Sequence, residues 1–149
     1  MLAMTSVQCI PMDINHLDSV YSISCSSFHT PWSESSIIAE LINPAAKYVV
    51  AVSEGKVIGF GGMWIILDEA HITNIAVASE YRKLGVGSLV LEALINTAEK
   101  AGAVAMTLEV RASNEAAKKL YAKYNFTKEG LRKGYYQDNN EDCIIMWRR

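Results

Sequence analysis

Two short segments of this chain carry residues whose types and spacing suit chemistry. The first is Arg82–Ser88, a basic turn that contains Gly85 and Gly87 and joins a short apolar segment to a long amphipathic one. Glycine has no Cβ, so the backbone can approach a ligand closely there. A helix that begins at this turn directs unpaired N–H groups and the positive end of its dipole toward it. The pattern indicates a site for a phosphate or pyrophosphate group.

Two common phosphate-binding loops do not fit this turn. A Walker A loop has Lys and then Ser or Thr directly after its second glycine, whereas Gly87 is followed by Ser88 and Leu89. A dinucleotide fingerprint has Gly or Ala three positions after its second glycine, and this chain has Val90 there. A simple turn in which the glycines only begin a helix stays open as the alternative.

The second segment is Leu108–Asn114, in which Glu109 interrupts an apolar run just before a turn. A carboxylate in such a place faces solvent, pairs with an arginine, or lines a site as a general base. On the amphipathic segment that follows, Tyr121 shares a face with apolar residues. Its phenol could donate a proton to a departing group, or the ring could belong to the core.

The elements that must position these residues follow from periodicity and turn signals. We expect strands over residues 6–10, 47–53, 56–66, 70–77, 103–110, 126–133 and 142–147, and helices over residues 14–28, 34–42, 84–101 and 113–124. Pro11 should stop the first strand, and Ser33 should cap the second helix. Glu54-Gly55 predicts a hairpin turn, and Ser113 or Asn114 should cap the last helix.

This order of elements is neither a regular βαβ alternation nor an all-β meander. It predicts an α/β (mixed α+β) fold in which helices cover the faces of a mixed sheet. The sequence contains no linker, repeat or low-complexity segment, so we expect residues 1–149 to form a single domain.

Composition narrows the class of protein. Half of the 149 residues are hydrophobic, and the net charge of −2 is spread along the chain, which gives no clustered basic face for nucleic acid. Cys9, Cys25 and Cys143 show neither disulfide nor metal-site spacing, so we expect reduced thiols and no metal. No apolar run approaches the about 20 residues that span a bilayer, and Met1–Thr5 lacks signal-peptide features. We expect a soluble, cytoplasmic protein without a membrane partner.

Taken together, these motifs resemble the GCN5-related N-acetyltransferases, the GNAT superfamily. Their pyrophosphate loop has Gln or Arg, two residues, Gly, one residue, and Gly or Ala, which Arg82–Gly87 matches. More narrowly, four further segments resemble the RimI-type ribosomal-protein-alanine N-acetyltransferases: Pro31-Trp32-Ser33, Asp68-Glu69-Ala70, Asn74–Val77 and Arg132–Tyr136. The similarity covers nearly all of the chain after about residue 28. One departure is Asn125-Phe126, where the family usually has Gly-Phe; Asn preserves the left-handed torsion of a helix end.

The resemblance implies a fold, a co-substrate and residue roles. It implies a sheet of about seven strands with about four helices, splayed between the fourth and fifth strands, and acetyl-CoA as the acetyl donor. In that family, a glutamate at the position of Glu109 is the general base and a tyrosine at that of Tyr121 is the general acid. Cofactor contacts are implied for Ile75, Ala76, Val77, Arg82, Lys83, Leu84, Gly85, Val86, Gly87, Ser88 and Asn114.

The implied acceptor is an N-terminal α-amine, that of an alanine in a ribosomal protein. No cysteine lies on the motifs, so we expect direct attack rather than an acetyl-cysteine intermediate. A small-molecule amine, a protein lysine and a non-catalytic acetyl-CoA sensor stay open as alternatives. Trp32, Tyr135 and Tyr136 are aromatic residues in loop-like contexts that could hold a peptide N-terminus, although Trp32 could equally fill the turn between two helices.

Overall fold

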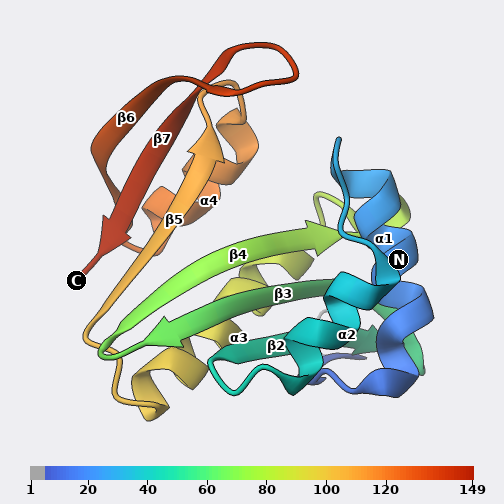
Figure 1. Ribbon diagram of the computed structural model, residues 1–149. Helices are drawn as coiled ribbons and strands as arrows, with labels where there is room; N and C mark the ends of the chain where they lie inside the picture. The colour runs from blue at the N-terminus through green and yellow to red at the C-terminus, as the bar shows by residue number, and fades with distance from the viewer. Residues whose placement is uncertain (1–5) are drawn as a thin grey trace.

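The computed structural model describes residues 6–149, and seven strands of this range form one mixed sheet (Figure 1). Their order across the sheet is β1-β2-β3-β4-β5-β7-β6. The strands are β1 (Val7–Pro11), β2 (Ala46–Ser53), β3 (Lys56–Ile66), β4 (Glu69–Val77), β5 (Ala105–Arg111), β6 (Thr127–Tyr136) and β7 (Glu141–Arg148). The helices are α1 (Leu17–Ser27), α2 (Glu34–Ile42), α3 (Val86–Lys100) and α4 (Glu115–Lys123), with short 3₁₀ turns η2 (Ile14–His16) and η3 (Ser79–Tyr81). Met1–Thr5, for which the sequence predicts no signal peptide, lies outside the described residues.

The helices cover both faces of the sheet (Figure 1). α3 and α4 pack on one face, in an apolar cluster that includes Val90, Leu94 and Met106. α1 and α2 pack on the other face, in a cluster that includes Val20 and Phe60. These two buried clusters hold the sheet between two helical layers, which is the arrangement expected for a mixed sheet.

The splay predicted between the fourth and fifth strands is confirmed. β4 and β5 run parallel and pair over three residues only, from Glu69↔Ala105 to His71↔Thr107. Beyond this point β4 and β5 continue in different directions, so β5, β6 and β7 stand away from the rest of the sheet (Figure 1). The Ala78 N–H donates to the Ile58 carbonyl at 2.8 Å. Because strand residues alternate, Ile75 and Val77 direct their N–H and C=O groups away from β3, toward the opening.

The mixed sheet and its elements are confirmed, but three details are corrected. Pro11 does not stop the first strand; it pairs with Val49, which is tolerated because β1 is an edge strand. Leu84 is not part of α3, because Gly85 is the N-cap residue. Tyr135 and Tyr136 are the last residues of β6 rather than loop residues.

The capping and turn predictions also have clear outcomes. Ser33 caps α2, and Asn114 rather than Ser113 caps α4. The Glu54-Gly55 turn has positive φ at both residues, 51° and 77°, as a two-residue hairpin turn that matches the sheet twist requires. The helix predicted from residue 14 begins as η2 and becomes α-helical only at Leu17. No helix in residues 6–149 is long and apolar enough to cross a bilayer.

Candidate active site

The turn before α3 has the geometry of an anion site. Lys83 and Gly85 adopt left-handed torsions, with φ of 64° and 89°, and no side chain among the described residues caps the helix that follows. The amides of the first helical turn therefore lack helical partners and face the exposed loop. Together with the positive end of the α3 dipole, they form a site that favours a phosphate.

Gly87 marks the point where three elements converge. A Cβ at this residue would lie 3.5 Å from Leu120 Cδ2 on α4 and 3.9 Å from Val77 Cγ2 at the end of β4. Ile75 and Val77 pack against the α3 cluster, whereas Ala76 is buried in the cluster on the opposite face. By the same alternation, the backbone N–H and C=O groups of Ala76 face β3, where it pairs with Phe60, so its predicted cofactor contact stays a prediction.

Arg82 does not provide the mobile positive charge that its place in the loop suggests. Its Nε donates to the Val77 carbonyl at 3.0 Å, and its Nη2 donates to Ser27 Oγ at 3.2 Å. The side chain therefore joins the end of β4 to the end of α1. Its contact with a cofactor stays a prediction, as do those of Lys83, Leu84, Val86 and Ser88.

Asn114 has a structural task in addition to the predicted one. Its side-chain oxygen accepts a hydrogen bond from the Ala117 N–H at 3.2 Å and so caps α4. A cofactor contact by Asn114 is compatible with this only through its amide N–H₂ or a second lone pair of the same oxygen.

Glu109 lies on the face of β5 opposite to the core. Met106, Leu108 and Val110 point into the α3–α4 cluster, so Glu109 points to the face that carries α1 and α2. Its side chain is 42% exposed, and Oε2 lies 3.6 Å from Arg132 Nε on β6. Of the environments that the sequence leaves open, the structure shows an exposed carboxylate with an arginine partner.

Tyr121 lies on the other face, in contact with the α3–α4 cluster. Its ring centroid is 5.8 Å from that of Phe126, and burial raises its pKa to about 12. The hydroxyl has no hydrogen-bond partner among residues 6–149, where no enclosed polar side-chain atom is unpaired, so the hydroxyl oxygen must reach open space. The phenol therefore stays protonated at neutral pH and is available as a donor.

Glu109 and Tyr121 are thus on opposite faces of the β5–β7–β6 part of the sheet. The structure does not bring the two side chains into contact. The separation of β4 from β5 is the place where the two faces meet, and the open backbone edge of Val77 lies there as well. A donor molecule entering from the α3–α4 side and an acceptor entering from the Glu109 side can meet at this opening.

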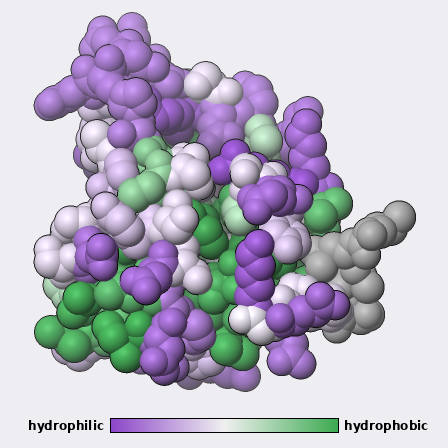
Figure 2. Space-filling model, turned by 90° about the vertical axis from the view of Figure 1, so that its right-hand side faces the viewer, coloured by the Kyte–Doolittle hydropathy of each residue, from purple (hydrophilic) through white to green (hydrophobic). Residues whose placement is uncertain are grey.

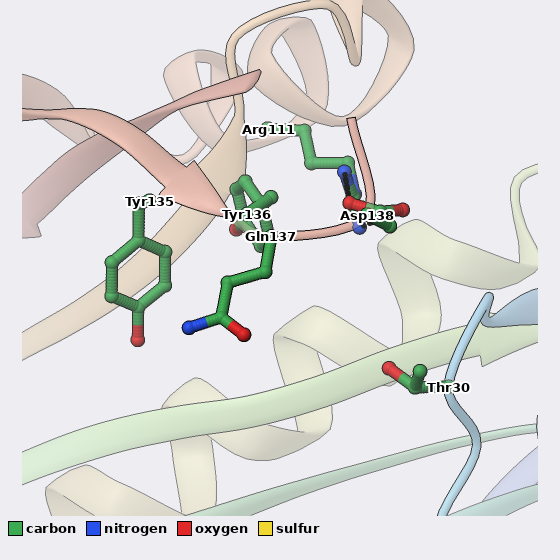
Figure 3. A pocket seen from close by; sticks show the side chains of 6 residues that line it. All are labelled: Thr30, Arg111, Tyr135, Tyr136, Gln137 and Asp138. Carbon is green, nitrogen blue, oxygen red and sulfur yellow. Dashed lines mark hydrogen bonds and ion pairs between the residues drawn. The ribbon is translucent and has the colours of Figure 1, made fainter. Parts of the chain in front are cut away.

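A pocket of about 410 Å³ lies on the Glu109 face (Figure 3). It is lined by Thr30, Arg111, Tyr135, Tyr136, Gln137 and Asp138. Both tyrosines line it because β6 is irregular between Arg132 and Tyr136, where Gly134 has a φ of 60°. The upper part of the molecule, where the β6–β7 hairpin stands, is largely hydrophilic on the face shown in Figure 2. Every side chain that lines the pocket carries a polar group, so the pocket suits a polar ligand.

The sequence predicts part of this pocket and misses the rest. Tyr135 and Tyr136, for which the sequence predicts acceptor contacts, both line the pocket, with their ring centroids 5.2 Å apart, and the contacts themselves stay predictions. Trp32 is not a lining residue and packs against the α1–α2 cluster, which favours its packing role. Thr30, in the same loop, takes its place. Arg111 could have been found from its position two residues after Glu109, on the same strand face.

Comparison with known proteins places this site in a family context. Residues 17–126 match the acetyltransferase (GNAT) family. A Bacillus subtilis (strain 168) protein provisionally named a ribosomal protein bS18-alanine N-acetyltransferase is 42% identical over 137 residues, 91% of each chain. The crystal structure of the ribosomal-protein-S18-alanine N-acetyltransferase from Escherichia coli matches with a TM-score of 0.87 and 34% identity, over 95% of this chain and 92% of that one. Ard1 from Thermoplasma volcanium matches with a TM-score of 0.88 and 26% identity, over 96% and 97%.

Alanine substitutions at Gly85 and Gly87 should distinguish the contribution of the turn from that of the helix that follows it. Gly85→Ala should lower the free energy of unfolding by about 1 kcal/mol, because a Cβ strains the left-handed torsion, and should weaken acetyl-CoA binding. Gly87→Ala is the matched control for stability alone, because Gly87 is itself a predicted cofactor contact: the residue is helical and a Cβ would make only ordinary contacts, so stability should be unchanged or rise by up to about 1 kcal/mol. Urea unfolding and calorimetric titration with acetyl-CoA measure both effects. If Gly85→Ala matched the wild type in both stability and acetyl-CoA affinity, this would contradict the assignment of the turn as the phosphate site.

Proposed function

Because this chain belongs to the acetyltransferase (GNAT) family, we propose that it transfers acetyl from acetyl-CoA to the N-terminal α-amine of ribosomal protein bS18, at an alanine. The names of its relatives support this acceptor. The observation that carries the proposal is the opening between β4 and β5, which has the uncapped turn before α3 and Tyr121 on one side and Glu109 with a polar pocket on the other.

The loop and the first turn of α3 fit the pyrophosphate of coenzyme A. Amides of Val86, Gly87 and Ser88 hold the phosphates, and exposed Lys83 adds a positive charge. The absence of a side chain at Gly87 leaves room for the donor beside Leu120 and Val77. Acetyl-CoA, when bound, supplies an acetyl thioester that a neutral amine can attack directly. The N–H groups of Ile75 and Val77 face the opening. They donate hydrogen bonds to the thioester carbonyl oxygen and stabilise the negative charge that develops on it during the attack.

Glu109 acts as the general base for the acceptor amine. Its exposed carboxylate accepts the proton, directly or through one water, and Arg132 at 3.6 Å orients it. An α-amine is easier to deprotonate than a lysine side chain, because its pKa of about 7.7–8 is well below that of lysine, about 10.4. Near neutral pH, a far larger fraction of α-amines is therefore already uncharged.

Tyr121 donates to the departing thiolate. Its pKa of about 12 lies above that of a free thiol, about 8.5, so the phenol supplies mainly a hydrogen bond to the sulfur rather than a complete proton transfer. This makes its contribution smaller than that of Glu109.

The acceptor can be identified by mass spectrometry. A peptide with the N-terminal sequence of bS18, starting at alanine, should gain one acetyl group on its α-amine in the presence of acetyl-CoA. The same peptide with a blocked N-terminus and an added internal lysine is the matched control and should stay unmodified. Acetylation of the lysine, or of a polyamine but not of the peptide, would overturn the proposed acceptor.

Glu109→Gln should lower turnover strongly, by roughly 10²–10⁴-fold, because the proton acceptor is lost. Acetyl-CoA binding should be unchanged, since Glu109 lies on the opposite face from the phosphate turn. Glu99→Gln is a suitable control, because Glu99 is also exposed and paired with an arginine, Arg148. Steady-state kinetics over a range of pH provides the measurement, and unchanged turnover at every pH would remove Glu109 from this role.

Tyr121→Phe should lower turnover by up to roughly 10²-fold. Because the pKa of Tyr121 is about 12, the phenol is protonated throughout the usual assay range, and the loss should be the same factor from roughly pH 6 to pH 9. Tyr124→Phe removes a hydroxyl from the C-cap residue of the same helix and should leave turnover unchanged. A full rate for Tyr121→Phe would assign Tyr121 to packing alone.

A further inference from the structure

Arg111 makes an unusual number of contacts with the β6–β7 hairpin. Nη1 and Nη2 donate to the two carboxylate oxygens of Asp138 at 3.1 and 3.0 Å. Nη1 also lies 3.3 Å from Asn139 Oδ1 and 3.4 Å from Glu141 Oε1. A planar guanidinium with several fixed donors is the group that can make such paired contacts, and lysine cannot reproduce them.

The same guanidinium lies over an aromatic wall of the pocket. The Arg111 Cζ is 4.0 Å from the centroid of the Tyr136 ring, a cation–π distance. Tyr136 lies on the same face as Glu109: burial raises the pKa of its phenol, and the neighbouring Cys143 thiol and Glu109 carboxylate raise it further. One side chain therefore fixes both Tyr136 and Asp138, the residues on either side of Gln137 (Figure 3).

The hairpin contacts extend to two other parts of the site. Glu141 accepts a hydrogen bond from the Ser113 N–H at 2.6 Å with its second oxygen, and this bond, with those from Asn139 and Arg111, lowers its pKa to about 2. Glu141 therefore connects the β6–β7 hairpin to the turn that precedes α4. On the opposite side, His29 Nε2 lies 3.8 Å from Asp138 Oδ2, which brings the α1–α2 loop and Thr30 to the pocket.

From these contacts we infer that Arg111 is a positioning residue for the acceptor: it holds the Tyr136–Asp138 wall of the pocket so that the acceptor amine is presented to Glu109. This inference rests on the proposed function. Arg111 does not contact the reacting atoms, and it acts through Asp138 and Tyr136. Its loss should affect capture of the acceptor and leave capture of acetyl-CoA unchanged, because the phosphate turn lies on the other side of the opening.

The test is steady-state kinetics of Arg111→Gln and Arg111→Lys with the alanine-ended bS18 peptide. The KM for the peptide should rise by roughly 10-fold or more for Arg111→Gln and somewhat less for Arg111→Lys, with the KM for acetyl-CoA unchanged. Arg148→Gln is the matched control. Arg148 is 26% exposed against 30% for Arg111 and also bonds a carbonyl and a glutamate, but at the far end of β7. Asp138→Asn should raise the peptide KM similarly, and the double variant with Arg111→Gln should add little.

Two further results decide between this inference and its alternatives. Hydrogen exchange of the protein alone should show faster exchange at residues 134–142 in Arg111→Gln and not in Arg148→Gln. An unchanged peptide KM, or an equal rise of both KM values with a loss of thermal stability, would overturn the positioning role. If the alanine peptide proves inert, the proposed acceptor fails; the same variants are then assayed with the lysine peptide or amine that the wild type does acetylate, so the role of Arg111 is still decided.

Discussion

The structure depends on one constraint, the short parallel pairing of β4 with β5. Three residue pairs hold these strands together before they separate. A longer pairing would close the sheet, and the outward N–H groups of Ile75 and Val77 would then be used in a ladder rather than left for a ligand. The separation also connects the two faces of the sheet, which a continuous sheet keeps apart.

The two sides of the opening are stabilised by different interactions. The α3–α4 side is an apolar core, in which Val90, Leu94 and Met106 are almost completely buried. The acceptor side is built from partly exposed charged groups, such as Arg111 with Asp138 and Glu109 with Arg132. Exposed ion pairs are weak individually and are screened by salt, whereas apolar burial is not. The α3–α4 side is therefore held by buried apolar contacts, whereas the wall around Arg111 and Asp138 depends on several weaker contacts acting together.

Much of this arrangement can be predicted from the sequence, because local signals determine it. Glycine favours left-handed torsions, and Gly85 adopts one. Asparagine favours helix caps, and Asn114 caps α4. The alternation of apolar residues around Glu109 correctly places its side chain opposite to the core. The pocket was harder to predict, because the irregularity at Gly134 turns Tyr135 and Tyr136 to one side, and strand alternation alone would separate them. Contacts across many residues, such as Arg82 with Ser27, leave no local signal.

The division between the two sides also indicates which parts of this fold can vary most freely. Ard1 from Thermoplasma volcanium shares nearly the whole fold with this chain at 26% identity, so the elements around the opening persist while most side chains change. A change in the donor side must repack a buried core. A change at Thr30 or Gln137 alters exposed residues in connecting segments, which tolerate substitution. On the proposed function, differences in acceptor preference are expected in the α1–α2 loop and the β6–β7 hairpin, and Arg111, which bonds the hairpin from β5, is the residue that we infer holds this wall in place.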